Sequence, residues 1–262
     1  MNILQKIAQR TKERIEAKKK YLPEERVKNL VSASKLNFPF EAALKSNDIS
    51  LICEIKKASP SKGIIAEDFP YLEIAKEYEA AGAAAISVLT EPFWFMGSDD
   101  FLRDISWEVN IPLLRKDFTV DSYMIYEAKL LGASAVLLIC SVLDKETLAE
   151  YLNIAHEIGL SVLVETHDEK EVETALSIGA RMIGVNNRNL KTFEVDITLS
   201  ERLRKLVPPD VIFVSESGIS TAQAIEKLRE IGADAALIGE SIMRSNDKKA
   251  AISALRGYSN AN

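Results

Sequence analysis

The 262-residue sequence predicts a (β/α)8 barrel with an N-terminal helical extension. The first observation is a repeat of Gly-Ala pairs at Gly82, Gly132, Gly179 and Gly232, which start 50, 47 and 53 residues apart. An amphipathic helical pattern precedes each pair and an apolar run follows it, so each glycine is expected to end a helix in a left-handed cap. About 25 residues per strand and helix, repeated eight times, is the period of such a barrel.

The second observation is a set of four further apolar runs between these repeats. They are LICEI (51–55), IPLLR (111–115), LSVLVE (160–165) and VIFVSE (211–216). Strands that alternate with helices predict βαβ units, and continuous apolar runs are typical of parallel strands covered on both faces. A doubly wound open sheet is the alternative. It usually has fewer strands and a GxGxxG turn after the first strand, which this sequence lacks.

Residues 1–48 precede the first strand and form the predicted extension. Their two helical patterns, LQKIAQRTKERIEAKKK and PEERVKNLVSAS, are expected to pack on the barrel as a pair of helices. The basic first pattern is similar to a transit peptide, but Glu13, Glu16 and the scarcity of serine argue against one. We therefore expect residues 1–262 to form a single barrel domain.

Composition limits the functions that fit the chain. A formal net charge of -6 and a pI near 5.3 argue against general nucleic-acid binding, which needs a basic face. No apolar run approaches the ~18 residues of a membrane span. Cys53 and Cys140 lack metal-ligand spacing and are expected to be buried reduced thiols. We expect a cytoplasmic protein, either a monomer or a weak homo-oligomer.

Charged side chains cluster where the predicted strands end. In this fold the active site lies at the C-terminal strand ends, because the loops there converge on one opening. Alternation along a strand places Glu54 and Lys56 on the same face, and an inward charge needs partners in a water-poor pocket. We expect the following ionisable side chains to converge at this opening: Glu54, Lys56, Lys116, Glu165 and Glu216.

Two glycine-containing segments suit a phosphate group. VSESGIS (214–220) is expected to lead through Gly218 into a helix, and LIGESIMRS (237–245) through Gly239 into a short helix. Glycine lets the backbone approach an anion, and free N–H groups at a helix start bind it. The loops after strands seven and eight are the usual phosphate site of this barrel. The first loop, SPSKG (59–63), is expected to form a lid over the substrate.

Seven motifs carry a resemblance to a known family. They are EIKKASPSKG (54–63), ISVLTEPFWFMGS (86–98), LLRKDF (113–118), LVET (163–166), GVNNRNLKTFEVD (184–196), VSESGI (214–219) and LIGESIMR (237–244). In order and content they resemble indole-3-glycerol-phosphate synthases of tryptophan biosynthesis. The resemblance implies a (β/α)8 barrel that closes the ring of 1-(2-carboxyphenylamino)-1-deoxyribulose 5-phosphate, releasing CO2 and water. It implies a phosphorylated small-molecule substrate and no cofactor or metal.

The resemblance also implies residue roles. Lys116 is the expected general acid, Glu165 the general base, and Lys56 the contact to the substrate carboxylate. Supporting and orienting roles go to Glu54, Asn186, Glu216 and Ser217. The phosphate side is expected to include Ser59, Arg188, Gly218, Gly239 and Glu240, and the apolar slot Phe95, Phe118, Leu137 and Leu190. We expect burial, or the nearby cation Lys56, to lower the pKa of Lys116 and make it a better acid.

Two competing interpretations are kept. Phosphoribosylanthranilate isomerases share the barrel and use a cysteine near the end of strand one, for which Cys53 is a superficial match. Glu54 and Glu165 do not fit that pattern. A non-catalytic barrel that binds a phosphorylated metabolite is the other alternative. The two histidines, His156 and His167, are expected to be surface or packing residues, although His167 is near enough to Glu165 to influence it.

Overall fold

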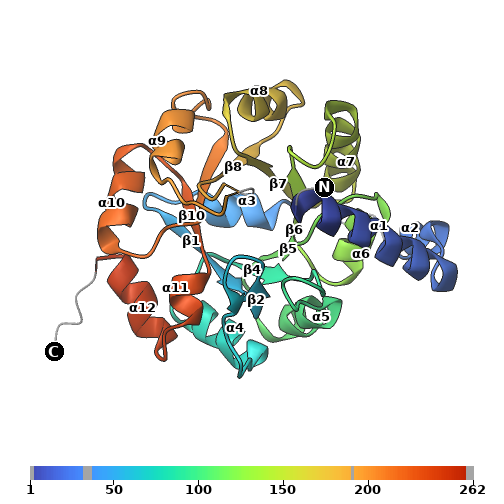
Figure 1. Cartoon of the computed structure of the whole chain (residues 1–262), viewed down its shortest axis with the longest axis horizontal. Coiled ribbons are helices and arrows are strands. Elements are labelled where there is room, and N and C mark those ends of the chain that lie inside the picture. The colour runs from blue at the N-terminus through green and yellow to red at the C-terminus, as the bar shows by residue number, and fades with distance from the viewer. Residues whose placement is uncertain (1–2, 32–36, 190–191, 258–262) are drawn as a thin grey trace.

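Eight parallel strands close into a barrel at the centre of the molecule (Figure 1). The computed structural model describes residues 3–31, 37–189 and 192–257. Strand β1 pairs with both β4 and β10, which closes the ring and makes the open-sheet alternative wrong. The barrel strands are β1 (Ser50–Ile55), β4 (Ala85–Leu89), β5 (Leu113–Lys116), β6 (Ala135–Ile139), β7 (Ser161–Thr166), β8 (Met182–Asn186), β9 (Ile212–Glu216) and β10 (Ala235–Ile238).

Helices surround the barrel, as the alternating pattern predicts (Figure 1). The four predicted caps are left-handed, with φ of 82° at Gly82, 85° at Gly132, 81° at Gly179 and 72° at Gly232. The helices that follow β1 are α4 (Tyr71–Ala80), α5 (Asp99–Glu108), α6 (Tyr123–Leu130), α7 (Lys145–Glu157), α8 (Glu169–Ser177), α9 (Thr198–Arg204), α10 (Ala222–Glu230), α11 (Glu240–Met243) and α12 (Lys248–Leu255).

Alternate strand residues divide the apolar core into two parts. Cys53 and Ile55 of β1 belong to the cluster between barrel and helices, whereas Ile52 belongs to the cluster inside the barrel. Because side chains alternate along a strand, Glu54 shares the inward face with Ile52. The barrel interior is therefore apolar toward the N-terminal ends of the strands and charged at their C-terminal ends.

The N-terminal extension contains three described helices rather than the expected pair: α1 (Ile3–Tyr21), α2 (Glu24–Leu30) and α3 (Pro39–Leu44). Helix α3 has only six residues, too few for a helical period to be evident in the sequence. Its Phe40 and Leu44 pack in the inner cluster, and the hydroxyl of Ser50, the first residue of β1, donates to the Leu44 carbonyl. Helix α3 thus closes the N-terminal end of the barrel.

Helix α1 crosses the opposite end, above the strand termini (Figure 1). Arg14 donates to Asp117 at 2.7 Å, and Lys18 pairs with Glu127 at 2.6 Å and also with Asp99. These partners lie about one hundred residues further along the chain, so the ion pairs fasten the extension to β5, α5 and α6. Among the described residues, no helix has the length and apolar character needed to cross a membrane.

Candidate active site

A cavity of about 430 Å³ opens at the C-terminal end of the barrel. Residues from all eight barrel strands, from α1 and from the connecting loops form its walls. It is lined by all the predicted site residues except Leu190, which lies outside the described residues: Glu54, Lys56, Ser59, Phe95, Lys116, Phe118, Leu137, Glu165, Asn186, Arg188, Glu216, Ser217, Gly218, Gly239 and Glu240.

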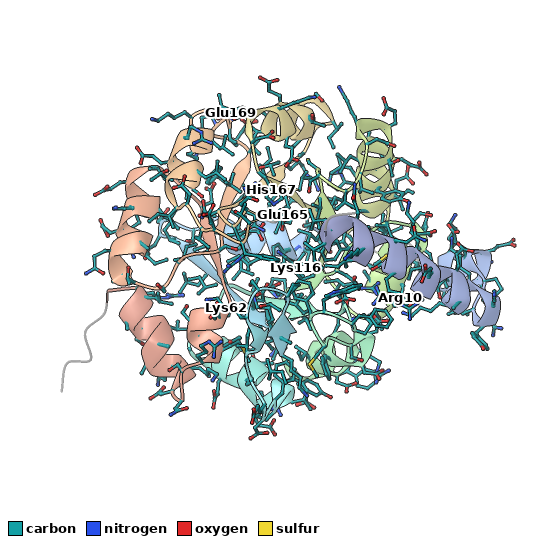
Figure 2. The ribbon with its side chains drawn as sticks, viewed as in Figure 1. Arg10, Lys62, Lys116, Glu165, His167 and Glu169 are labelled. Atoms are coloured by element: carbon teal, nitrogen blue, oxygen red, sulfur yellow. The ribbon has the colours of Figure 1, made fainter. Side chains whose placement is uncertain are left out.

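Lys116 lies between two carboxylates from other strands. Its ammonium is 2.7 Å from Oε2 of Glu216 and 3.2 Å from Oε2 of Glu165. The exposed fractions are small, at 13% for the Lys116 side chain, 4% for Glu165 and 2% for Glu216. Figure 2 shows Lys116 and Glu165 in the middle of the barrel, with His167 beside Glu165. One cation is therefore shared by two buried acids at the floor of the cavity.

Burial and mutual attraction shift these groups in different directions. Burial disfavours the charge on Lys116, but Glu216 and Glu165 outweigh it and raise the pKa of the ammonium well above its usual value. The expectation that this pKa is lowered is therefore wrong. For Glu165 burial opposes ionisation, yet Lys116 and then His167 lower its pKa to about 2. Burial raises the pKa of Glu216 to about 7, with Lys116 opposing the rise and Glu165 adding to it.

Glycines on neighbouring strands leave room for the buried acids. A Cβ atom on Gly184 would lie 2.2 Å from Oε1 of Glu216, and one on Gly239 would lie 2.4 Å from Oε2 of Glu54. Lys56 forms an ion pair with that Glu54 carboxylate across the top of β1. Since neither distance is compatible with a side chain, both positions require glycine for the acids to occupy these places.

The end of the cavity expected to hold phosphate is made of backbone turns. Ser217 and Gly218 both adopt left-handed conformations, with φ of 67° and 78°, and the Asn187 side chain donates to the Ser217 carbonyl at 3.1 Å. Gly218 does not lead directly into a helix: α10 starts at Ala222, and Thr221 caps it. The amides expected near phosphate are therefore those of the turn itself. Gly239, by contrast, directly precedes α11 as expected.

The other end of the cavity is apolar. The rings of Phe95 and Phe118 lie with centroids 6.3 Å apart, and Leu137 adds to the same wall. Leu4 and Ile7 of α1 also line the cavity, which the sequence reasoning missed. Their helical spacing on a face that includes the buried Ile15 was the available signal.

A cavity of this size, with an aromatic wall at one end, backbone turns at the other and a buried Lys–Glu set between them, can bind an aromatic sugar phosphate and transfer protons on it. A sequence model of the indole-3-glycerol phosphate synthase family matches residues 4–255. The chain belongs to the indole-3-glycerol phosphate synthase family. Its activity is that of a carboxy-lyase of tryptophan biosynthesis.

Two relatives illustrate the similarity. The indole-3-glycerol phosphate synthase of Ruminiclostridium cellulolyticum is 61% identical over 257 residues, covering 97% of this chain and 99% of the relative. That of Lachnoclostridium phytofermentans is 52% identical, covering 97% and 98%. Among solved structures, a mutant tryptophan synthase α-subunit from Pyrococcus furiosus has a TM-score of 0.62 at 16% identity, over 80% of this chain and 98% of that one. That likeness supports the fold alone.

Within this indole-3-glycerol phosphate synthase fold, Glu91 organises the loop after β4. It is fully buried, and its carboxylate accepts hydrogen bonds from the backbone N–H groups of Phe93, Trp94 and Phe95 at 2.7–3.0 Å. This loop presents Phe95 to the cavity. Sequence reasoning missed Glu91, although an acid inside the apolar segment EPFWF was a signal that it caps backbone donors.

The first loop forms a small hairpin over the cavity. Its strands are β2 (Ala58–Ser59) and β3 (Gly63–Ile64), and Ser59 to Ser61 line the cavity. The Ala58 N–H donates to the carbonyl of Phe95 at 3.2 Å, which joins this hairpin to the loop after β4. At its tip Lys62 lies 3.8 Å from Glu240, which also pairs with Arg244 at 3.2 Å. The hairpin thus spans from the apolar wall to the phosphate side.

Four further observations test the predictions made for the cysteines, the histidines and a metal site. Cys53 faces the outer helices, and burial raises its pKa to about 12, so it does not fit the catalytic cysteine of an isomerase. Cys53 and Cys140 are both free thiols; Cys53 is buried as expected, whereas Cys140 is only half-buried. His167 lies mostly buried beside Glu165, so the expected nearness to this acid is confirmed, whereas a surface position is not. Within the part of the chain that the structure describes, no cluster of three or more His, Cys, Asp or Glu side chains suits a metal ion.

Proposed function

We propose that this chain closes the ring of 1-(2-carboxyphenylamino)-1-deoxyribulose 5-phosphate to give indole-3-glycerol phosphate, CO2 and water. The observation that carries the proposal is the Lys116 ammonium held by Glu165 and Glu216 inside the cavity. The aromatic wall and the backbone turns lie at opposite ends of that cavity, in keeping with an anthranilate ring at one end and a phosphate at the other.

Lys116 is the general acid. Ring closure makes a carbon–carbon bond between the aromatic carbon that bears the carboxylate and the ketone carbon, whose oxygen takes a proton. A positioned ammonium stabilises the charge that develops on this oxygen and supplies the proton. The carboxylate neighbours of Lys116 raise its proton affinity. Lys116 therefore gives up its proton only when a strongly basic alkoxide develops on the ketone oxygen. Glu216, whose pKa is raised to about 7 mainly by burial, can return a proton to Lys116.

Glu165 is the general base. In the free enzyme the two cations beside it, Lys116 and His167, keep its pKa near 2 against the effect of burial, which makes it a weak base. When Lys116 gives its proton to the substrate, one of these cations is lost and the basicity of Glu165 rises. The acid step thereby prepares the base that removes a proton from the substrate, while an ammonium, that of Lys56 or of Lys116 once Glu216 has reprotonated it, protonates the departing hydroxyl so that it leaves as water. Loss of the carboxylate as CO2 comes between these steps.

Lys56 and the cavity ends orient the substrate. The Lys56 ammonium, paired with Glu54, faces the cavity and is suited to contact the substrate carboxylate. Arg188, the turn at Ser217–Gly218 and the Gly239–Glu240 segment are assigned to the phosphate side, with Ser59 in the hairpin above. Phe95, Phe118 and Leu137 are assigned to the ring. Leu190 is assigned to the same slot from the sequence alone.

The proposal extends to the setting of the reaction. We assign no cofactor or metal to it, only a phosphorylated small-molecule substrate, and place it in the cytoplasm with the chain as a monomer or weak homo-oligomer. Light scattering of the purified chain across a range of concentrations tests the last point: a stable dimer at the lowest concentration would contradict it.

Turnover of the purified chain tests the function. Incubation with the anilino-ribulose phosphate should produce indole absorbance, whereas incubation with phosphoribosylanthranilate should not change that substrate. Lys116→Ala and Glu165→Ala should each lower kcat by at least roughly 10²–10⁴, the usual effect of a positioned acid or base. Lys76→Ala, which breaks a surface ion pair with Glu108, is the matched control and should keep full activity. Near-normal turnover in both site variants would refute the assignment.

A further inference from the structure

His167 lies directly behind Glu165, on the side away from Lys116. Its Nε2 is 3.4 Å from Oε1 of Glu165, whereas Lys116 contacts Oε2 at 3.2 Å. The other ring nitrogen, Nδ1, lies 3.1 Å from Oε2 of Glu171 on α8, and that same oxygen accepts from the His167 backbone N–H at 2.8 Å. The imidazole therefore bridges a carboxylate in the barrel and a carboxylate on the surrounding helices.

Acids dominate the surroundings of this imidazole. Glu165 faces it from β7 and Glu171 from α8, while Asp168 begins that helix as its N-cap. A further titratable neighbour is Cys140 at the end of β6, whose sulfur contacts the Glu171 carbonyl at 3.8 Å and whose pKa is raised to about 12, first by burial and then by these same acids. The arrangement favours a doubly protonated ring: Nδ1 is within hydrogen-bond distance of Glu171, and Nε2 forms an ion-pair contact with Glu165.

We propose that His167 is the positioning residue of Glu165: it fixes the carboxylate from behind and remains as its counter-charge when Lys116 releases a proton. The inference rests on the proposed roles of Lys116 and Glu165. It adds a third cation to the site, one that never touches the substrate, since His167 is absent from the cavity wall formed by the described residues.

The balance of charge in the site explains why Glu165 needs the imidazolium of His167. Lys116 is shared between Glu165 and Glu216, so in a site without His167 its deprotonation would leave both buried acids with no cation in contact. An isolated ionised carboxylate in a water-poor pocket is very unfavourable. With the imidazolium behind it, Glu165 stays ionised and correctly oriented until it accepts a proton. Glu171 in turn holds the ring through Nδ1, as an acid behind a functional histidine commonly does.

The pH dependence of kcat tests whether the positive charge of His167 lowers the pKa of Glu165. His167→Gln keeps a hydrogen-bond donor near Glu165 but removes the positive charge. The acidic limb of the kcat profile should move to higher pH by about 1–3 units, because an opposite charge within ~4–6 Å lowers a carboxyl pKa by that amount. At neutral pH kcat should fall by roughly tenfold or more through misorientation of the base, with KM within about twofold of its original value.

The second histidine supplies a matched control. His156 lies on α7, packs edge-on against Phe38 and does not line the cavity. His156→Gln should leave the pH profile unchanged. A variant of His167 that merely loosened the fold would lower kcat and the melting temperature without moving the acidic limb, and that result would overturn the inference.

A spectroscopic test does not depend on turnover. The chain has only two histidines, so imidazole nitrogen NMR resolves them, with His156→Gln providing the assignment. His167 should remain doubly protonated at pH 8, where a histidine with an ordinary pKa near 6.5 is neutral. Glu165→Gln and Glu171→Gln should each lower its pKa by at least about one unit.

The outcomes separate the two proposals. If the unmodified chain fails to turn over the anilino-ribulose phosphate, the proposed function is wrong whatever the imidazole does. If it turns over and His167→Gln has an unchanged acidic limb, or the ring is neutral at pH 8, the function stands and the role of His167 is wrong.

Discussion

The guanidinium of Arg14 on α1 lies 2.7 Å from the carboxylate of Asp117, the residue that directly follows Lys116. The Asp117 side chain is fully buried and also accepts from the Thr90 hydroxyl at 2.7 Å. One ion pair therefore joins the helix that roofs the cavity to the strand that carries the proposed acid.

Loosening this ion pair should weaken substrate binding more than chemistry. Arg14→Ala leaves Asp117 buried with fewer donors and frees α1, whose Leu4 and Ile7 line the cavity. We expect a loss of about 1–3 kcal/mol of stability and a severalfold higher KM, with kcat changed less. Thermal melting and steady-state kinetics measure both. Lys12→Ala, an exposed position on the same helix, is the control, and an equal effect there would contradict the prediction.

The pKa of Glu216 predicts a pH-dependent stability. Burial chiefly raises it to about 7, so the folded chain holds this proton at pH values where the unfolded chain has released it. The associated stability is fully present below the ordinary carboxyl pKa and is lost as pH rises through about 7. Glu216→Gln should remove this loss, on the order of 1–3 kcal/mol, between pH 5 and pH 8. Denaturant titrations at pH 5 and pH 8 measure this loss, with Glu226→Gln as the exposed control. An equal loss of stability between the two pH values in the unmodified chain and in Glu216→Gln would contradict the prediction.

Gly184 should resist even the smallest enlargement. A Cβ atom there would lie 2.2 Å from Oε1 of Glu216, so Gly184→Ala must displace that acid. We expect about 1–3 kcal/mol of destabilisation, the usual cost of overpacking, together with a large drop in kcat.

A double-mutant cycle isolates this contact. In a Glu216→Ala background the same change at Gly184 should cost clearly less stability, because the clashing oxygen is gone. Equal costs in both backgrounds would show that the strain lies elsewhere.

Glu91 should control the apolar wall. Glu91→Gln replaces one of the two carboxylate oxygens that hold three backbone N–H groups with an amide donor, so the loop carrying Phe95 should loosen. We expect about 1–3 kcal/mol of lost stability and roughly tenfold higher KM, with a smaller change in kcat. Substrate titrations followed by indole absorbance measure this. Glu108→Gln, at an exposed surface pair, should behave like the unmodified chain.

The regular parts of the fold follow from local sequence patterns. The Gly-Ala spacing predicts the barrel because each glycine ends a helix in the left-handed region, as found at Gly82 and Gly132. Strand alternation predicts that Glu54 faces the interior, since a period of two depends only on neighbouring residues. Lys116 and Glu165 could be chosen as site residues because each ends a barrel strand.

Features that depend on distance between remote residues could not be predicted. The direction in which the pKa of Lys116 shifts is set by two acids 49 and 100 residues away, because their attraction to the ammonium outweighs the effect of burial. The contact of His167 with Glu165 depends on the turn after β7, which the sequence pattern does not specify. Helix α3 is too short to have a period, and although an acid in the apolar segment at Glu91 indicates a capping role, the sequence does not show that its three donors come from the loop that carries Phe95.

Phe40 and Leu44 of α3 close the N-terminal end of the barrel, and this closure has a kinetic consequence. Because that end is blocked, the product has to leave through the same opening by which the substrate enters, past Leu4 of α1 and the β2–β3 hairpin. Substrate entry and product release then share one opening, so loosening α1 should change the rates of both together.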